Sequence, residues 1–127
     1  MTHERLLTYA KEALATAYAP YSHFAVGAAL LCADGTVYTG CNIENAAFSP
    51  TVCAERVAVF KAISEGKRDF DAIAIVNGNG TPCSPCGVCR QVMSEFCAPD
   101  FTIVLEDKNG KPVPYSLAEL LPHSFQL

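Results

Sequence analysis

Residues 71–105 read DAIAIVNGNGTPCSPCGVCRQVMSEFCAPDFTIVL and give the clearest indication of the fold. Residues 71–77 and 101–105 each contain an uninterrupted apolar run, so both segments are expected to be buried strands. Turn-forming residues fill 77–85, and the segment 86–97 between the strands is expected to be a helix. A helix that joins two strands in this way is the usual crossover between parallel strands of one sheet.

The same alternation continues outward from this unit toward both ends of the chain. An apolar stripe at helical spacing near the start predicts a helix, and Asp34-Gly35 is typical of a hairpin turn between two strands. The other predicted elements are helices over 2–18, 49–65 and 116–121, strands over 24–31 and 37–40, and a short strand after 108–111. Together they predict an α/β fold, a three-layer α-β-α sandwich around a mixed five-stranded sheet.

Two of these helices carry clear signals at their ends. Ser49-Pro50 is expected to begin the second helix, with Ser as the N-cap and Pro at the first helical position. Gly66 is expected to end that helix. Ser116 and Glu119 match the capping box that begins the short last helix.

Composition indicates a single globular domain over residues 1–127. Half of the residues are hydrophobic, which is enough for a core, so disorder is excluded. The net charge is −4 and no Lys/Arg cluster occurs, which argues against a nucleic-acid partner. The longest apolar run, 24–33, is too short to span a bilayer, and the first residues lack a secretory-signal pattern. We therefore expect a cytoplasmic protein with no membrane partner.

Cysteine is unusually frequent, with residues at positions 32, 41, 53, 83, 86, 89 and 97. An odd number without a secretory signal argues against a disulfide framework. In a reducing compartment, clustered cysteines more often bind metal or take part in redox chemistry. Cys32, Cys41 and Cys97 have apolar neighbours and are interpreted as small buried hydrophobic residues.

Cys53, Cys86 and Cys89 are the candidate ligands of one metal ion. Cys86 and Cys89 are three residues apart at the start of a predicted helix, so both thiols lie on one face. Cys53 lies in the first turn of the helix predicted over 49–65. Helix N-termini carry partial positive charge, which lowers a thiol pKa and favours the thiolate that binds metal. Three thiolates around Zn²⁺ leave one tetrahedral position for water, as in catalytic rather than structural zinc sites.

Charged residues beside these cysteines are candidates for the same site. Glu55 follows Cys53 by two residues and could carry protons between water and substrate. A carboxylate at a helix N-terminus is also a common stabilising feature, and the neighbouring cysteines are what favour the catalytic interpretation. Three thiolates outweigh the charge of Zn²⁺, so Arg56 and Arg90 are expected to donate to ligand sulfurs and ease the negative charge.

Cys83 and Cys86 form a second, overlapping Cys-x-x-Cys and offer an alternative pair of ligands. Pro85 disfavours a helix that runs back to Cys83, whereas Cys86 and Cys89 can share one turn, and we favour the latter pair. Because a lone Cys-x-x-Cys is also typical of structural zinc and redox motifs, a non-catalytic zinc or redox module is a second hypothesis.

Cys53-Ala54-Glu55 together with Pro85-Cys86-Gly87-Val88-Cys89 matches the signature of zinc-dependent deaminases, in which three cysteines can be the ligands. Nearly the whole chain then resembles the small homotetrameric cytidine deaminases. The resemblance rests on APYSHFAVGAAL (19–30), GCNIENA (40–46), CAER (53–56), PCGVCRQ (85–91) and LLPHSF (120–125). It implies a cytidine-deaminase-like fold, one Zn²⁺ per subunit, and hydrolysis of free cytidine and deoxycytidine to uridine and deoxyuridine with release of ammonia, a step of pyrimidine salvage.

The resemblance also implies the substrate contacts. The residues expected to bind the nucleoside are Phe24, Asn42, Ile43, Glu44, Ala54 and Phe125. Asn42 and Glu44 would hold the ribose hydroxyls, because a carboxylate accepts hydrogen bonds while an amide both donates and accepts. Ala54 would contact the base through its backbone, Phe24 would form a wall of the base pocket, and Phe125 would reach it from a neighbouring subunit.

One residue departs from the family pattern, and two related deaminases are alternative functions. Phe48 stands where many relatives have Tyr, so the hydroxyl available for an interface hydrogen bond is absent. A blasticidin S deaminase would share the zinc motifs but lack the Asn-Ile-Glu-Asn loop. A deoxycytidylate deaminase would need a phosphate site with additional Lys or Arg, which is not evident in this sequence.

Overall fold

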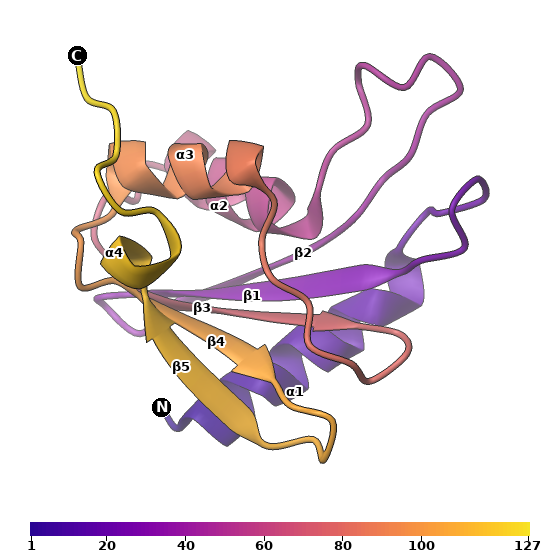
Figure 1. Cartoon of the computed structure of the whole chain (residues 1–127), viewed down its shortest axis with the longest axis horizontal. Coiled ribbons are helices and arrows are strands. Elements are labelled where there is room, and N and C mark those ends of the chain that lie inside the picture. The colour runs from indigo at the N-terminus through magenta and orange to yellow at the C-terminus, as the bar shows by residue number, and fades with distance from the viewer.

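The computed structural model describes all residues 1–127 and contains one five-stranded sheet (Figure 1). The elements are α1 (His3–Ala13), η1 (Leu14–Thr16), β1 (Val26–Cys32), β2 (Val37–Cys41), α2 (Ala54–Ser64), β3 (Phe70–Asn77), α3 (Gly87–Phe96), β4 (Thr102–Glu106), β5 (Pro112–Ser116) and α4 (Leu117–Leu120). The strands lie in the order β2-β1-β3-β4-β5. No helix is long and apolar enough to cross a membrane.

The sheet is mixed, as predicted. β1 pairs antiparallel with both β2 and β3, β3 pairs parallel with β4, and β5 returns antiparallel to β4. The parallel pair is the one that α3 connects, in agreement with the crossover inferred from residues 71–105. The mixed sheet and the crossover are therefore confirmed.

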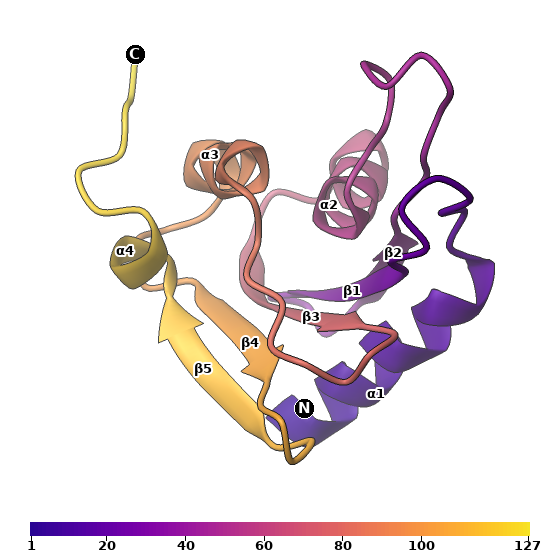
Figure 2. The same ribbon diagram turned by 45° about the vertical axis from the view of Figure 1, so that its right-hand side comes forward.

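Helices cover both faces of the sheet, which confirms the three-layer arrangement (Figure 2). α1 packs on one face through Leu6, Leu7 and Ala10, against small and branched residues of β3 and β4. α2 and α3 lie side by side on the other face, over a larger cluster that includes Leu30, Ile73, Ile75 and Ile103. Strands covered on both faces explain the continuous apolar runs in the sequence.

Close approach of helix and sheet depends on a glycine in β2. A Cβ at Gly40 would lie 2.3 Å from the carbonyl oxygen of Ala54 and 2.7 Å from the amide nitrogen of Ala58. Only a residue without a side chain allows this approach. Gly40 therefore seats the N-terminal turn of α2 directly on the edge strand, which fixes the position of the residues at the start of that helix.

Two predicted helix boundaries are wrong. The helix predicted from Ser49-Pro50 begins at Ala54, because Val52 forms a β-bridge with Ile43 and Phe48 has a positive φ of 64°. The first helix, predicted over 2–18, ends at Ala13 and continues only as a 3₁₀ turn over 14–16. The capping box of Ser116 and Glu119 is confirmed, with both of its hydrogen bonds present.

Candidate functional site

Three cysteine sulfurs meet where the N-termini of α2 and α3 lie together. Cys53 is the N-cap residue of α2 and Cys86 is the N-cap residue of α3, while Cys89 lies in the first turn of α3. The three sulfurs lie within 4.8 Å of one another, and those of Cys53 and Cys86 are 3.7 Å apart. This donor set fits one tetrahedral Zn²⁺ with a fourth position open, because thiolates are preferred zinc ligands.

The electrostatic surroundings of the cluster favour a thiolate. The pKa of Cys53 is lowered to about 5, first because the Cys89 thiol donates to its sulfur and further because Arg56 donates to it. The Nη2 atom of Arg56 lies 3.4 Å from the sulfur of Cys53. The predicted contact between Arg56 and a cluster sulfur is therefore present in the structure.

Arg90 has a different set of partners. Its Nε donates to the carbonyl oxygen of Pro85 at 2.8 Å, and its Nη1 donates to the carbonyl oxygen of Leu120. The structure shows no hydrogen bond from Arg90 to a sulfur, so the expected sulfur contact of Arg90 is not formed. Instead, Arg90 ties the residue before Cys86 to the end of α4.

Glu55 is buried beside the cluster in the first turn of α2. Its side chain is 4% exposed, and burial raises its pKa to about 7. A negative Cys53 acts in the same direction, because a nearby like charge disfavours the carboxylate. A carboxyl group with a pKa close to neutrality can both accept and release a proton, which is what general acid–base catalysis requires.

A cleft of about 500 Å³ opens directly on Glu55 and the cluster. It is lined by Ser22, Phe24, Val26, Asn42, Glu44, Thr51, Val52, Cys53, Ala54, Glu55, Cys83, Ser84 and Cys86. Among the predicted substrate contacts, Phe24, Asn42, Glu44 and Ala54 are brought together here. Cys83 lines the cleft but does not belong to the three-sulfur cluster, which favours Cys89 as the partner of Cys86.

Two predicted contacts lie elsewhere. Ile43 does not line the cleft: its backbone bridges Tyr18 and Val52. Phe125 is 65% exposed on the C-terminal tail, which rises beside α3 and away from the β2–α2 loop (Figure 1). Its carbonyl oxygen accepts a hydrogen bond from Gln91 at 3.4 Å. Within one chain, the ring of Phe125 is not part of the cleft.

Sequence reasoning missed the lining residues Ser22, Val26, Thr51, Val52 and Ser84 of the cleft. Ser22 lies within residues 19–30, which carry the family resemblance, and that position could have identified it as a candidate site residue. Phe48, the departure from Tyr, is 73% exposed and packs edge to face against Tyr21 with ring centroids 6.4 Å apart.

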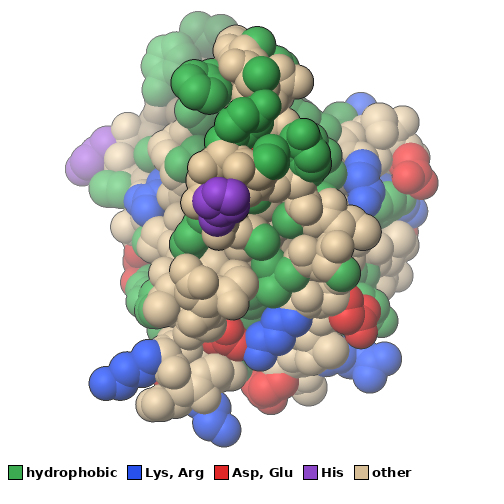
Figure 3. Space-filling model, turned by 90° about the vertical axis from the view of Figure 1, so that its right-hand side faces the viewer, with side chains coloured by type: hydrophobic (Ala, Val, Ile, Leu, Met, Phe, Trp, Pro, Cys, Tyr) green, Lys and Arg blue, Asp and Glu red, His purple; other side chains and the backbone are tan.

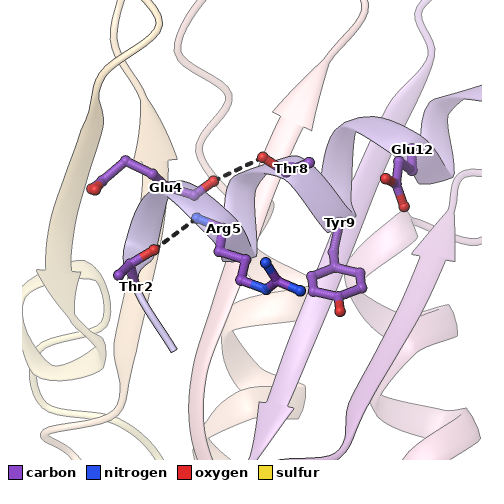
Figure 4. Close-up of a pocket in the computed structure, with 6 residues that line it drawn as sticks. All are labelled: Thr2, Glu4, Arg5, Thr8, Tyr9 and Glu12. Carbon is purple, nitrogen blue, oxygen red and sulfur yellow. Dashed lines mark hydrogen bonds between the residues drawn. The ribbon is translucent and has the colours of Figure 1, made fainter.

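A larger hollow of about 610 Å³ lies on the outer surface of α1, on the face of the sheet opposite the three-cysteine cluster (Figure 4). Its side chains are occupied within their own helix: Thr2 accepts from the backbone of Arg5, and Thr8 donates to the carbonyl of Glu4. The guanidinium of Arg5 stacks over the ring of Tyr9. Only one of the lining residues is hydrophobic, so this surface lacks the apolar walls typical of a ligand site.

A three-layer α/β sandwich with three thiols and a buried carboxyl group at two facing helix N-termini defines a zinc-binding deaminase. The family model described as "Cytidine and deoxycytidylate deaminase zinc-binding region" matches residues 1–105. The chain belongs to this cytidine and deoxycytidylate deaminase family.

Individual relatives agree with this assignment. The chain is 51% identical to the cytidine deaminase of Sporosarcina psychrophila, over 98% of this chain and 92% of the relative. It is 35% identical to the blasticidin-S deaminase of Bacillus cereus, over 92% of this chain and 87% of that protein. The crystal structure of cytidine deaminase from Burkholderia pseudomallei superimposes with a TM-score of 0.92 at 48% identity, covering 98% of this chain and 100% of that one.

Proposed function

We propose that this chain catalyses the hydrolytic deamination of cytidine and deoxycytidine to uridine and deoxyuridine, with release of ammonia. The observation that carries the proposal is that a three-sulfur cluster and the buried Glu55 open on one cleft of nucleoside size. The family, and relatives named cytidine deaminase at 45–51% identity over nearly the whole chain, support it.

Cys53, Cys86 and Cys89 would hold one Zn²⁺, which when bound would supply the Lewis acidity that makes water nucleophilic near neutral pH. Glu55 would carry one proton of the attacking water to the ring nitrogen beside C4. It would then carry the proton of the new C4 hydroxyl to the amino group, so that the C4–N bond breaks, the C4 carbonyl forms and ammonia leaves. Burial of Glu55 and its pKa of about 7 support this role, because the same group must accept and release the proton. Arg56 would ease the negative charge of the cluster through its bond to Cys53.

The walls of the cleft would orient the nucleoside. Ala54 is the first residue of α2. Because the first N–H group that bonds within the helix is that of Val57, the backbone N–H of Ala54 has no helical partner and is free to donate to the base. Phe24 would cover the base with its ring. Asn42 and Glu44 would meet the sugar hydroxyls, which supports a nucleoside rather than a free base as substrate.

The test follows the loss of the cytosine absorption band of cytidine with purified protein and with a Glu55→Ala variant of matched zinc content. Loss of the band and release of ammonia with the wild type alone would support the proposal. Turnover of blasticidin S without turnover of cytidine would contradict the substrate. Equal turnover by the Glu55→Ala variant would contradict the role of Glu55.

We also propose that the chain is a single domain, acts in the cytoplasm in pyrimidine salvage, and assembles as a homotetramer. Seven cysteines, all free, suit a reducing compartment. Hydrophobic side chains gather over the projecting loops on one face (Figure 3), and the exposed ones near the cleft are Tyr18, Tyr21, Phe24, Ile43 and Phe48. Such a patch is typical of an interface, and in an assembly the exposed Phe125 could complete a neighbouring cleft. A stable monomer in light scattering at working concentration would contradict the tetramer.

A further inference from the structure

The carboxylate of Glu44 is held by the segment that precedes β1. Its Oε1 atom accepts hydrogen bonds from the backbone N–H groups of Tyr21 at 2.9 Å and Ser22 at 3.1 Å. Its Oε2 atom accepts from the hydroxyl of Ser22. The two carboxylate oxygens therefore have separate anchors: the backbone fixes one, and a single side chain fixes the other.

The hydroxyl of Ser22 also reaches the backbone of Phe24. It accepts a hydrogen bond from the N–H group of Phe24 at 3.1 Å, while the carbonyl oxygen of Phe24 accepts one from the amide of Asn42 at 2.7 Å. The peptide groups on both sides of Phe24 are thereby fixed. One hydroxyl thus connects the candidate sugar contact, Glu44, with the candidate wall of the base pocket.

The backbone between these contacts is in a conformation that needs support. His23, between Ser22 and Phe24, has a φ of 58°, in the left-handed region that residues with a side chain rarely adopt. Its N–H group donates to the carbonyl oxygen of Ala19 at 3.0 Å. Such conformations persist where surrounding bonds determine them, and they occur often at ligand sites.

The carboxylate of Glu44 has few acceptor positions left for a ligand. An ionised carboxylate offers about four acceptor positions, and three hydrogen bonds already occupy Glu44. The hydrogen bond from Ser22 is also the largest cause of the lowered pKa of Glu44, which keeps the group ionised. One acceptor position is left on a carboxylate that lines the cleft, which suits a single sugar hydroxyl.

We propose that Ser22 is a positioning residue, which orients the carboxylate of Glu44 toward the sugar hydroxyl of a bound nucleoside and fixes Phe24 at the wall of the cleft. This role rests on the proposed nucleoside deamination. Removal of the hydroxyl leaves both backbone bonds to Oε1 in place, so the segment keeps its main anchor and the chain should fold. What is lost is the restraint on Oε2, the oxygen through which Ser22 sets the direction of the carboxylate.

The test compares Ser22→Ala and Ser22→Thr with the matched control Ser49→Ala, which removes a hydroxyl from an exposed loop residue outside the cleft. Each variant is assayed with cytidine and with 2′,3′-dideoxycytidine, which lacks the sugar hydroxyls that Glu44 would bind. We expect Ser22→Ala to lower kcat/KM for cytidine about tenfold, mainly through KM, as for loss of one charge-assisted contact. The loss for the dideoxy substrate should be about threefold or less, through Phe24 alone.

A double-mutant cycle separates orientation of Glu44 from a general structural effect. In a Glu44→Ala background, adding Ser22→Ala should lower kcat/KM for cytidine by no more than the loss seen with the dideoxy substrate. Ser22→Thr should restore most of the activity, and Ser49→Ala should match the wild type.

Three results would overturn the inference. Equal losses on the two substrates, a full additional loss in the Glu44→Ala background, or unchanged activity of Ser22→Ala would each exclude a role through Glu44. The failure of the proposed function is recognised separately, because the wild type itself would then show no turnover of cytidine.

Discussion

Replacement of Gly40 by Ala tests whether the contact between β2 and α2 places the metal cluster. The added Cβ would lie 2.3 Å from the carbonyl oxygen of Ala54, whereas ordinary contact begins at 3.4 Å, so α2 must retreat by about 1 Å. Because Ala54 is the first residue of α2, the displacement falls on the turn that carries Cys53 and Glu55. The sheet backbone cannot yield easily, since Gly40 is paired with Ala28 within the β1–β2 ladder and pairs flank it on both sides.

The expected effects are large on both stability and activity. Over-packing of this kind costs about 2–3 kcal/mol, equivalent to a fall in melting temperature of about 10 °C for a chain of this size. Displacement of reacting groups by about 1 Å should lower kcat for cytidine about a hundredfold. Thermal unfolding of the zinc-loaded protein and steady-state kinetics would measure the two effects.

Gly78→Ala is the matched control. A Cβ at Gly78 would meet its nearest atom, the Cβ of Ala25, at 3.8 Å, which is ordinary contact. Its stability should therefore stay within about 0.5 kcal/mol of the wild type, with normal kinetics. If Gly40→Ala behaved like this control, the seating of α2 on β2 would not be what positions the cluster.

Three further predictions follow from single contacts. Cys86→Ser should abolish zinc binding measured by atomic absorption, whereas Cys83→Ser should keep about one zinc per chain, the occupancy expected of one tetrahedral site; retained zinc in Cys86→Ser would refute the ligand set. Arg90→Ala should speed amide hydrogen exchange at the C-terminal tail, because Arg90 holds the carbonyl of Leu120; unchanged exchange there would show that this bond does not anchor the tail. Lys67 donates a hydrogen bond to Asp34 and lowers the pKa of the Asp34 carboxyl group. The stability contributed by this ion pair is therefore present above the ordinary carboxyl pKa and is lost as the pH falls through the lowered pKa. The melting temperature of Asp34→Asn should therefore lie below that of the wild type at pH 7 and approach it in strong acid, and a difference independent of pH would contradict the ion pair.

Local patterns were sufficient to predict the layers of the fold. The apolar runs of β3 and β4 are buried on both faces, and the segment between them contains the crossover helix α3. The capping box at Ser116 was equally readable, because both of its hydrogen bonds join residues three apart. Patterns of this kind succeed where the deciding interactions are close in sequence.

The start of α2 could not be read from local sequence. Ser49-Pro50 is a good N-terminal signal, yet the backbone of Val52 pairs with that of Ile43 in both directions, at 3.0 Å each. That pairing keeps the chain extended up to Cys53 and delays the helix. The partners of Arg90 were inaccessible for the same reason, because Leu120 lies far along the chain. Long-range pairing overrode local propensity at both places.

The delayed start of α2 has a chemical consequence. It makes Cys53 the N-cap residue of α2, matching Cys86 at the start of α3, so both cysteines lie at the positive ends of helices that face one cluster. Three thiolates and a divalent ion would be net negative, and two helix N-termini together with Arg56 offset that charge. Had α2 begun at Ser49, Cys53 would lie within the helix, where its sulfur would be further from the unpaired N–H groups. The bridge between Ile43 and Val52 thus links the two parts of the site. Asn42 and Glu44, which would hold the sugar, flank Ile43 on one side of the bridge, and Cys53 follows Val52 on the other.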